Sequence, residues 1–259
     1  KIIHPKDCFA FLEQFQLHHF LLSALDCAYW DLFGKLENKS FSGINQLENK
    51  TLAESSITIS IAEIDEQIRK IENSSWNKFK VKCNGFNLKN TEKLLNLNRN
   101  IALDANASFT KEDCLFIQET SGFQKLMYIE QPLEIGNFGI LKNGNSVNWM
   151  ADEDCQDLTF LEKLKPYYSS INIKLMKCGG LTPALEMITE AKKLGYKIML
   201  GCMTESSIGI SAGCAIAGLL DFADLDGANL ISNDYATGSF VDNGKIILSE
   251  KPGLGIALL

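Results

Sequence analysis

Several common sequence features are absent from this chain, and each absence narrows the functions open to it. No apolar run approaches the roughly 20 residues that a helix needs to cross a bilayer. There is no Walker phosphate loop, no Gly-x-Gly-x-x-Gly after a strand and no Gly-x-Ser-x-Gly elbow. Basic residues are in the minority. The net charge of −7 argues against nucleic acid or an anionic membrane as the main partner.

Cysteine pairs and histidine clusters are missing as well. The eight cysteines are scattered with no Cys-x-x-Cys pair, which favours reduced thiols in a cytoplasmic protein over a disulfide scaffold or a zinc cluster. The three histidines (His4, His18 and His19) have no metal-ligand spacing, and we interpret them as surface or packing residues.

The hydrophobic pattern predicts helices followed by an α/β barrel. Residues 7 to about 38 repeat apolar side chains at three- and four-residue steps, which is typical of helix. From Ser56 onward, short apolar runs alternate with amphipathic segments, which indicates βα units and a parallel sheet. The predicted strands are 57–61, 79–83, 101–106, 126–130, 149–153, 171–176, 197–202 and 222–226. Helices are predicted between successive strands, most clearly at 182–194 and 206–219.

Polar residues recur at the ends of these strands, 22 to 28 positions apart: Lys82, Asp104, Glu130, Asp152, Lys174, Cys202 and Asp224. That step is about one βα unit, so each residue takes the equivalent place on its strand. In a TIM barrel this place is the C-terminal face, where active sites are built. We therefore predict one shared site rather than scattered surface charge.

Three successive carboxylates, Asp104, Glu130 and Asp152, predict a Mg²⁺ site, because hard oxygen ligands suit this cation. Any one of them alone could instead cap a helix or pair with a lysine. Three unpaired carboxylates at one barrel mouth would repel each other without a cation. Asn106 and Glu153 are expected beside this set in a supporting role.

Lysines flank the carboxylates on both sides of the sequence. Lys80 and Lys82 share one face of their strand, and by themselves they would indicate a solvated edge. With Lys174 on the opposite strand, they favour proton removal from one face of a substrate and return to the other. This requires a lysine pKa that falls toward neutrality through burial and a neighbouring ammonium such as Lys80. Lys177 would lie past its strand and is given no role.

Two further features have competing interpretations. Asp224 and Asp226 could form a cap or turn, but we favour a site for a cationic substrate group such as an α-ammonium. Gly179-Gly180 could bind an anion before a helix, but a tight turn is the more frequent explanation.

Five motifs surround these residues in chain order: Lys80-Val-Lys82, Leu103-Asp104-Ala-Asn106, Ile129-Glu130-Gln131-Pro132, Ala151-Asp152-Glu153 and Ile173-Lys174-Leu-Met-Lys-Cys-Gly-Gly. Together they resemble the muconate-lactonizing subgroup of the enolase superfamily. The segment from Ala24 to Lys35 is similar to the helix that precedes the barrel there. Within the subgroup, the segments Gly201–Ser206 and Asp224–Asp226 resemble dipeptide epimerases of the L-Ala-D/L-Glu type.

The resemblance implies a modified TIM barrel, (β/α)₇β, with a partial α+β capping domain. Residues 1–54 would be the remaining helical part of the cap, 55–227 the barrel, and 228–259 a return to the cap. The family's N-terminal capping strands, whose loops read the substrate side chains, would precede Lys1. The dipeptide side chains are therefore left open, and so is the question of a homo-oligomer.

The implied reaction is Mg²⁺-dependent epimerisation of L,X-dipeptides at the carbon α to the carboxylate, by 1,1-proton transfer through an enediolate. The implied roles are as follows: Mg²⁺ ligands Asp104, Glu130 and Asp152; acid/base pair Lys82 and Lys174, assisted by Lys80; α-ammonium site Asp224 and Asp226; further substrate contacts Cys202, Met203 and Thr204.

Three alternatives remain open. One is another reaction of the same subgroup: N-acylamino acid racemisation, o-succinylbenzoate synthesis or cycloisomerisation. Asp224 and Asp226 argue against it, because those substrates lack a free α-ammonium. The second is a Schiff-base lysine in an aldolase-like barrel, which the three carboxylates disfavour. The third is a non-catalytic ligand-binding barrel.

Overall fold

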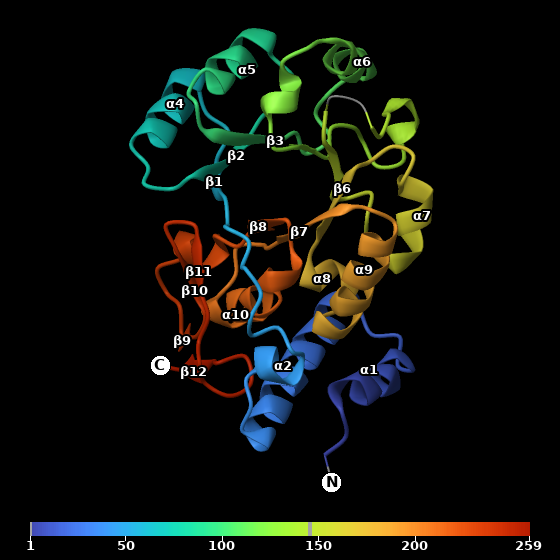
Figure 1. The fold of residues 1–259 in the computed structure, drawn as a ribbon, viewed down its shortest axis with the longest axis vertical. Helices are drawn as coiled ribbons and strands as arrows, with labels where there is room; N and C mark the ends of the chain where they lie inside the picture. The colour runs from blue at the N-terminus through green and yellow to red at the C-terminus, as the bar shows by residue number, and fades with distance from the viewer. Residues whose placement is uncertain (1, 145–146) are drawn as a thin grey trace.

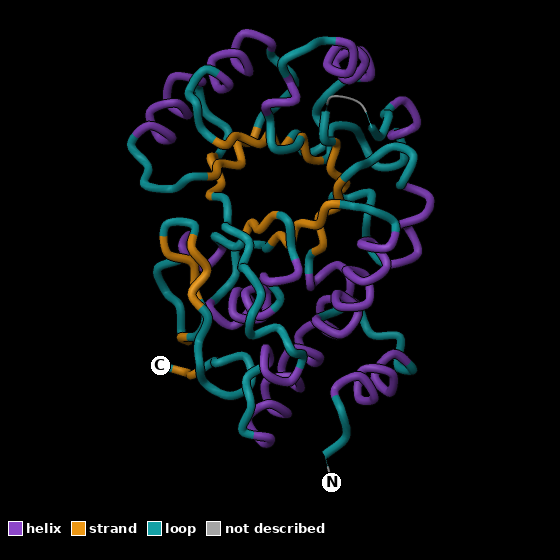
Figure 2. The backbone as a smooth tube through the Cα atoms, viewed as in Figure 1, coloured by secondary structure: helices purple, strands orange, loops and turns teal. Residues whose placement is uncertain are grey.

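A ring of eight parallel strands forms the centre of the protein. The computed structural model describes residues 2–144 and 147–259. Within these ranges the strands pair in chain order from the first to the eighth, and a bridge between Ser55 and Ala223 closes the ring (Figure 2). The strands are β1 (Ile57–Ile59), β2 (Lys78–Lys82), β3 (Asn100–Asp104), β4 (Ile129–Glu130), β5 (Trp149–Ala151), β6 (Ser170–Ile173), β7 (Lys197–Gly201) and β8 (Phe222–Asp224). The predicted α/β barrel is confirmed.

Helices cover the outside of the ring. Between the strands lie α4 (Ile64–Glu72), α5 (Leu88–Leu95), α6 (Lys111–Glu119), α7 (Leu161–Leu164), α8 (Leu175–Cys178), α9 (Leu181–Lys193) and α10 (Ser207–Ala215). Short 3₁₀ turns accompany them: η1 (Phe123–Lys125), η2 (Phe138–Ile140), η3 (Leu158–Phe160) and η4 (Ala217–Leu219). Local sequence sets several of these starts. At α6, for example, Thr110 and Asp113 form a reciprocal capping box.

The connection from β4 to β5 departs from the prediction of a helix between every pair of strands. Its described residues contain only the 3₁₀ turn η2. The segment from Gly136 to Gly144 is rich in glycine and asparagine, which are poor helix formers. Buried Leu133, Phe138 and Leu141 cover the barrel there instead.

Alternate side chains of each strand point to opposite faces of the barrel wall. The outward set packs under the helices in the main hydrophobic core. Toward the amino-terminal ends of the strands, the interior is filled by a second, smaller apolar cluster of Ala102, Tyr128, Met150 and Met199. The charged strand-end residues lie beyond this cluster, so the barrel has an apolar floor and a polar mouth.

Two helices precede the barrel, in the region of residues 7 to about 38 that the sequence pattern predicts to be helical. They are α1 (Pro5–Glu13) and α2 (His19–Glu37), and α2 packs against α8 and α9 (Figure 1). His4 and His18 are their N-caps, since each Nδ1 accepts a backbone N–H two residues later. The short α3 (Phe41–Ile44) then leads toward β1.

After β8 the chain returns to the side of α2 and α10. It forms the turn η5 (Gly227–Leu230) and two small antiparallel pairs. The first pair joins β10 (Phe240–Asp242) to β11 (Lys245–Ile247), and the second joins β9 (Ala236–Thr237) to β12 (Ala257–Leu258) (Figure 1).

A buried carboxyl fastens α2 to the barrel. Asp26 accepts the backbone N–H of Thr182 at 2.8 Å and its hydroxyl at 2.7 Å, and Trp30 Nε1 donates to the same hydroxyl oxygen at 2.9 Å. A Cβ at Gly180 would lie 2.5 Å from Asp26 Oδ2, and φ there is +130°. The Gly179-Gly180 pair is therefore the predicted tight turn. Burial raises the pKa of Asp26 to about 6, although the Thr182 hydrogen bonds oppose it.

Candidate active site

The carboxyl ends of β2 to β6 carry the five charged side chains predicted from the strand spacing. Lys82 lies beside Asp104 in the strand register, and Asp104 lies beside Glu130. Asp152 directly follows β5, and Lys174 directly follows β6. The structure thus brings the five together at the end of the barrel where the active sites of this architecture lie.

Two lysines lie at the ends of opposite strands of the ring, and each bonds a carboxylate. Lys82 Nζ donates to Asp104 Oδ2 at 2.9 Å and to Asn106 Oδ1 at 2.7 Å. Lys174 Nζ donates to Asp152 Oδ2 at 2.7 Å. Their strands are four apart in a ring of eight, so the two ammonium groups approach the mouth from opposite sides. Their side chains are 33% and 14% exposed, which leaves both within reach of a bound molecule.

Lys80 does not lie on a solvated edge. Its side chain is 6% exposed inside the barrel, where it is paired with Asp224 and lies 3.6 Å from Glu130 and 3.7 Å from Asp104. Burial acts to lower its pKa, but the three carboxylates outweigh burial and raise the pKa of Lys80 well above its ordinary value. Lys80 is therefore a fixed positive charge that holds carboxylates together.

The expected fall in a lysine pKa is wrong for Lys174 in this structure. Burial acts in the expected direction, but the carboxylates of Asp152 and Glu130 dominate and raise the pKa of Lys174. The prediction rests on neighbouring ammonium groups, whereas carboxylates lie closer to Lys174. A cation that shared the charge of those carboxylates would act to lower the pKa of Lys174.

Asp224 and Asp226 do not form one open pair. Asp224 is 2% exposed, accepts from Lys80 and from the Ser56 hydroxyl, and lies within the barrel. Asp226 Oδ2 accepts the backbone N–H of Thr58 at 2.7 Å. Of the predicted alternative of a cap or turn, the turn is present, because the backbone carbonyl of Asp226 accepts the Asn229 N–H in η5, whereas its side chain makes no capping bond.

The side chains of the three predicted metal ligands do not form a preformed metal site. Among residues 2–144 and 147–259, no three His, Cys, Asp or Glu side chains converge closely enough to hold an ion. Each carboxylate is held separately: Asp104 by Lys82, Glu130 by Asn172 at 2.6 Å and Asp152 by Lys174.

The charges of the site nevertheless fit a divalent cation. Glu130 Oε2 is buried and has no hydrogen-bond partner among residues 2–144 and 147–259. Burial is the main cause that raises the pKa of Glu130 to about 8, against the opposing charge of Lys80. Six carboxylates and four lysines gather here, which gives a net charge of −2 when all are ionised. They are Asp104, Glu130, Asp152, Glu153, Asp224, Asp226, Lys80, Lys82, Lys174 and Lys177. An all-oxygen donor set with an unsatisfied buried oxygen suits Mg²⁺.

The two residues predicted as auxiliaries lie where expected. Asn106 accepts from Lys82, and its backbone N–H donates to Asp104 Oδ1 at 3.2 Å. Glu153 Oε2 is buried and lacks a hydrogen-bond partner. Burial first, and then the charge of Asp152, raise the pKa of Glu153.

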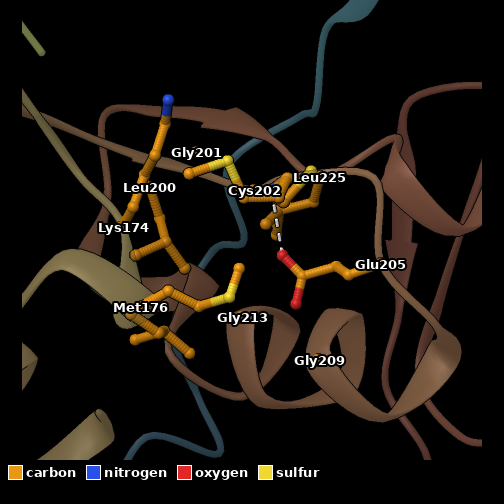
Figure 3. A pocket seen from close by; sticks show the side chains of 11 residues that line it. Lys174, Met176, Leu200, Gly201, Cys202, Glu205, Gly209, Gly213 and Leu225 are labelled. Atoms are coloured by element: carbon orange, nitrogen blue, oxygen red, sulfur yellow. Dashed lines mark hydrogen bonds between the residues drawn. The ribbon is translucent and has the colours of Figure 1, made fainter. Parts of the chain in front are cut away.

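The residues after β7 lie at the same end of the barrel. Met203 is 37% exposed, Thr204 is exposed and Cys202 is half-buried. A cavity of about 10 Å³ lies between this loop, α8 and α10. Lys174 lines it, but its Nζ points away from Glu205 (Figure 3). Such a volume holds at most a single water molecule, so it is a packing gap and not a substrate site.

Three polar residues that had no predicted role surround the site. Asn172 bonds Glu130, and Lys177 bonds Asp152. Gln131 Oε1 accepts the backbone N–H groups of Asp152 and Asp154, each at 3.1 Å. Strand alternation could have identified Asn172, which is two residues before Lys174 on the inward face. Lys177 lies in a helix, where that two-residue period no longer applies.

Comparison with known proteins agrees with this geometry. Residues 63–259 match the family described as Enolase C-terminal domain-like. The L-Ala-D/L-amino acid epimerase of Maribacter sp. is 35% identical over 262 residues, covering 98% of this chain and 77% of that protein. The L-Ala-D/L-Glu epimerase of Bacteroides thetaiotaomicron is also 35% identical, covering 90% of this chain and 63% of that protein.

Solved structures show the same likeness. A dipeptide epimerase from Methylococcus capsulatus, complexed with Mg ion, superposes with a TM-score of 0.84 at 26% identity, covering 98% of this chain and 79% of that one. Within the described residues we find no helix with the length and apolarity needed to span a membrane. The chain therefore belongs to the enolase superfamily and is an isomerase, related to the epimerases.

Proposed function

We propose that this enzyme is a Mg²⁺-dependent epimerase of L,X-dipeptides, which inverts the carbon α to the substrate carboxylate. The observation that carries the proposal is the opposition of Lys82 and Lys174 across a mouth lined by carboxylates. Inversion needs a proton to leave one face of a carbon and return to the other, and two amines on opposite sides can do this. The names of the relatives support a dipeptide as the substrate.

Asp104, Glu130 and Asp152 would hold the Mg²⁺. When bound, the ion stabilises the negative charge that develops on the substrate carboxylate as the α-proton leaves. Lys82 and Lys174 would exchange the proton, one on each face. Lys80 would hold Glu130 and Asp224 close together from inside the barrel.

Asp226 is our candidate for the α-ammonium of the dipeptide. Asp224 already accepts a hydrogen bond from the Lys80 ammonium. It would therefore not bind the substrate directly, and would contribute negative charge near Asp226. Cys202, Met203 and Thr204 would contact the substrate from the β7 end. We place the reaction in the cytoplasm, because all eight cysteines are free thiols.

Deuterium incorporation from D₂O into a dipeptide panel, followed by proton NMR, tests the proposal. We expect exchange at the C-terminal α-carbon for L,L and L,D epimers in the presence of Mg²⁺. Lys82→Ala should abolish exchange from one epimer, and Lys174→Ala should abolish it from the other. The matched control is Lys93→Ala, which removes a surface lysine paired with Asp65 and should leave exchange unchanged.

The outcome that contradicts the proposal is a folded, Mg²⁺-loaded protein that exchanges no dipeptide, or a Lys174→Ala variant with full exchange in both directions. The Asp226→Asn variant distinguishes an enzyme that acts on dipeptides from one that acts on N-acylated substrates. It should damage turnover of dipeptides and spare a substrate that lacks a free α-ammonium.

A further inference from the structure

Lys177 lies three residues beyond Lys174, in the short helix α8, and is buried with 9% of its side chain exposed. Its Nζ is paired with Asp152 Oδ1 and also donates to the backbone carbonyl of Asp152 at 2.6 Å. Two further carbonyls, of Cys155 and Asn172, lie at 3.2 Å. Four acceptors therefore surround an ammonium that has three donors.

This environment differs from that of Lys174, which bonds the other oxygen of the same carboxylate. Within the described residues, Lys174 Nζ makes one hydrogen bond, to Asp152 Oδ2, and its side chain is more exposed than that of Lys177. Lys174 can move toward a bound molecule by giving up that single contact. If Lys177 moved away, three buried carbonyls and one carboxylate oxygen would lose their hydrogen-bond donor. Each buried acceptor left without a donor costs free energy.

The acceptors of Lys177 come from separate parts of the barrel. Asp152 and Cys155 belong to the turn after β5, and Asn172 belongs to β6. The backbone carbonyl of Lys177 is itself bonded by His19 Nδ1 at 2.5 Å, which ties α8 to the start of α2. One ammonium group thus fixes the turn that carries Asp152 against the strand that carries Lys174.

We propose that Lys177 is a positioning residue, which holds the Asp152 carboxylate in the orientation that binds the metal. The inference rests on the proposed function, in which Asp152 is a Mg²⁺ ligand and Lys174 carries a proton. Lys177 takes Oδ1 and the backbone carbonyl, so the remaining oxygen of Asp152 faces Lys174 and the mouth. Groups that orient ligands in this way change metal affinity by about 10- to 100-fold when they are removed.

Calorimetric titration of MgCl₂ into the full chain tests this inference without any substrate. Lys177→Met keeps an unbranched side chain, one heavy atom shorter, and removes the charge and donors. We expect Mg²⁺ to bind this variant about 10- to 100-fold more weakly than the wild type. Lys177→Gln retains two donors without the charge, and its affinity should lie between the two. Lys93→Met is the matched control and should bind Mg²⁺ as the wild type does.

Dipeptide exchange in D₂O separates positioning from proton transfer. At subsaturating Mg²⁺, Lys177→Met should slow exchange from both epimers by the same factor, and raising Mg²⁺ should restore most of the rate. Lys174→Ala should lose one direction only, and added Mg²⁺ should not restore it.

Wild-type Mg²⁺ affinity in a folded Lys177→Met variant overturns the inference. So does failure of both Lys177 variants to fold, because the lysine would then serve the fold and not the placement of Asp152. If the wild type exchanges no dipeptide while Lys177→Met still binds Mg²⁺ more weakly, the proposed function fails and the positioning role stands.

Discussion

Replacing Asp26 with asparagine tests whether one buried carboxyl makes this protein less stable as the pH rises toward neutrality. Its pKa is about 6 in the folded protein, against 3.8 for the unperturbed group, and burial is the main cause. The folded state therefore binds this proton more tightly than the unfolded state does. The stabilisation is complete below pH 3.8 and is lost as the pH rises through 6.

The size of the effect follows from that difference. A shift of about two units corresponds to about 3 kcal/mol of unfolding free energy. The asparagine side chain of the variant cannot titrate, so the stability of the wild type relative to the variant should fall by that amount between about pH 4 and pH 7. The variant also loses the bond from the Thr182 hydroxyl, a pH-independent cost of about 1 kcal/mol.

Urea denaturation at several pH values, followed by tryptophan fluorescence, measures the difference. Asp65→Asn is the matched control, because Asp65 is exposed and its hydrogen bond to Lys93 lowers its pKa, which predicts a change of the opposite sign. Parallel stability curves for the wild type and Asp26→Asn from about pH 4 to pH 8 would refute the reasoning.

Three further perturbations have defined outcomes. Lys80→Met leaves three buried carboxylates without their shared cation and should cost about 3–5 kcal/mol in urea denaturation; a loss below about 1 kcal/mol would contradict the interior ion pairs. Gly201→Ala places a Cβ 2.6 Å from Asn172 Oδ1. We therefore expect a loss of about 1–3 kcal/mol of unfolding free energy, and weaker Mg²⁺ binding by calorimetry. The control is Gly139→Ala, where no described atom lies within 4 Å of the added Cβ. Trp30→Ala removes a fully buried side chain and should cost about 3–5 kcal/mol, seen as a lower urea midpoint; an unchanged midpoint would show that α2 is not fastened through this residue.

The regular part of the site could be predicted from the sequence, because the barrel repeats one unit at a nearly constant step. Lys82, Asp104, Glu130, Asp152 and Lys174 end successive strands, and parallel strands bring their carboxyl ends to one face. Strand alternation also placed Lys80 on the same side of its strand as Lys82.

Depth within the barrel could not be predicted from the same spacing. Strands in a closed barrel are staggered, and the offset accumulates to the seam where the last strand meets the first. The bridge between Ser55 and Ala223 lies at that seam, so Asp224 at the end of β8 sits level with Ser56 and Lys80. The constant spacing predicts only that Asp224 takes the equivalent place on its own strand. The spacing also could not show that the lysines pair directly with carboxylates. Because of this pairing the pKa of Lys174 is raised, where a fall was expected.

The hydrogen bonds that fasten α2 join residues far apart in the chain, and this sets an order of events during synthesis. Thr182 lies 156 residues after Asp26 and 152 after Trp30. At ribosomal rates of about 5–20 residues per second, roughly 8–30 s pass between the appearance of the two partners. For that time Asp26 and Trp30 lack their Thr182 partner, and the side of α2 that packs on α8 and α9 in the folded protein is uncovered. Chaperone protection of nascent chains would matter most between the synthesis of α2 and that of α9.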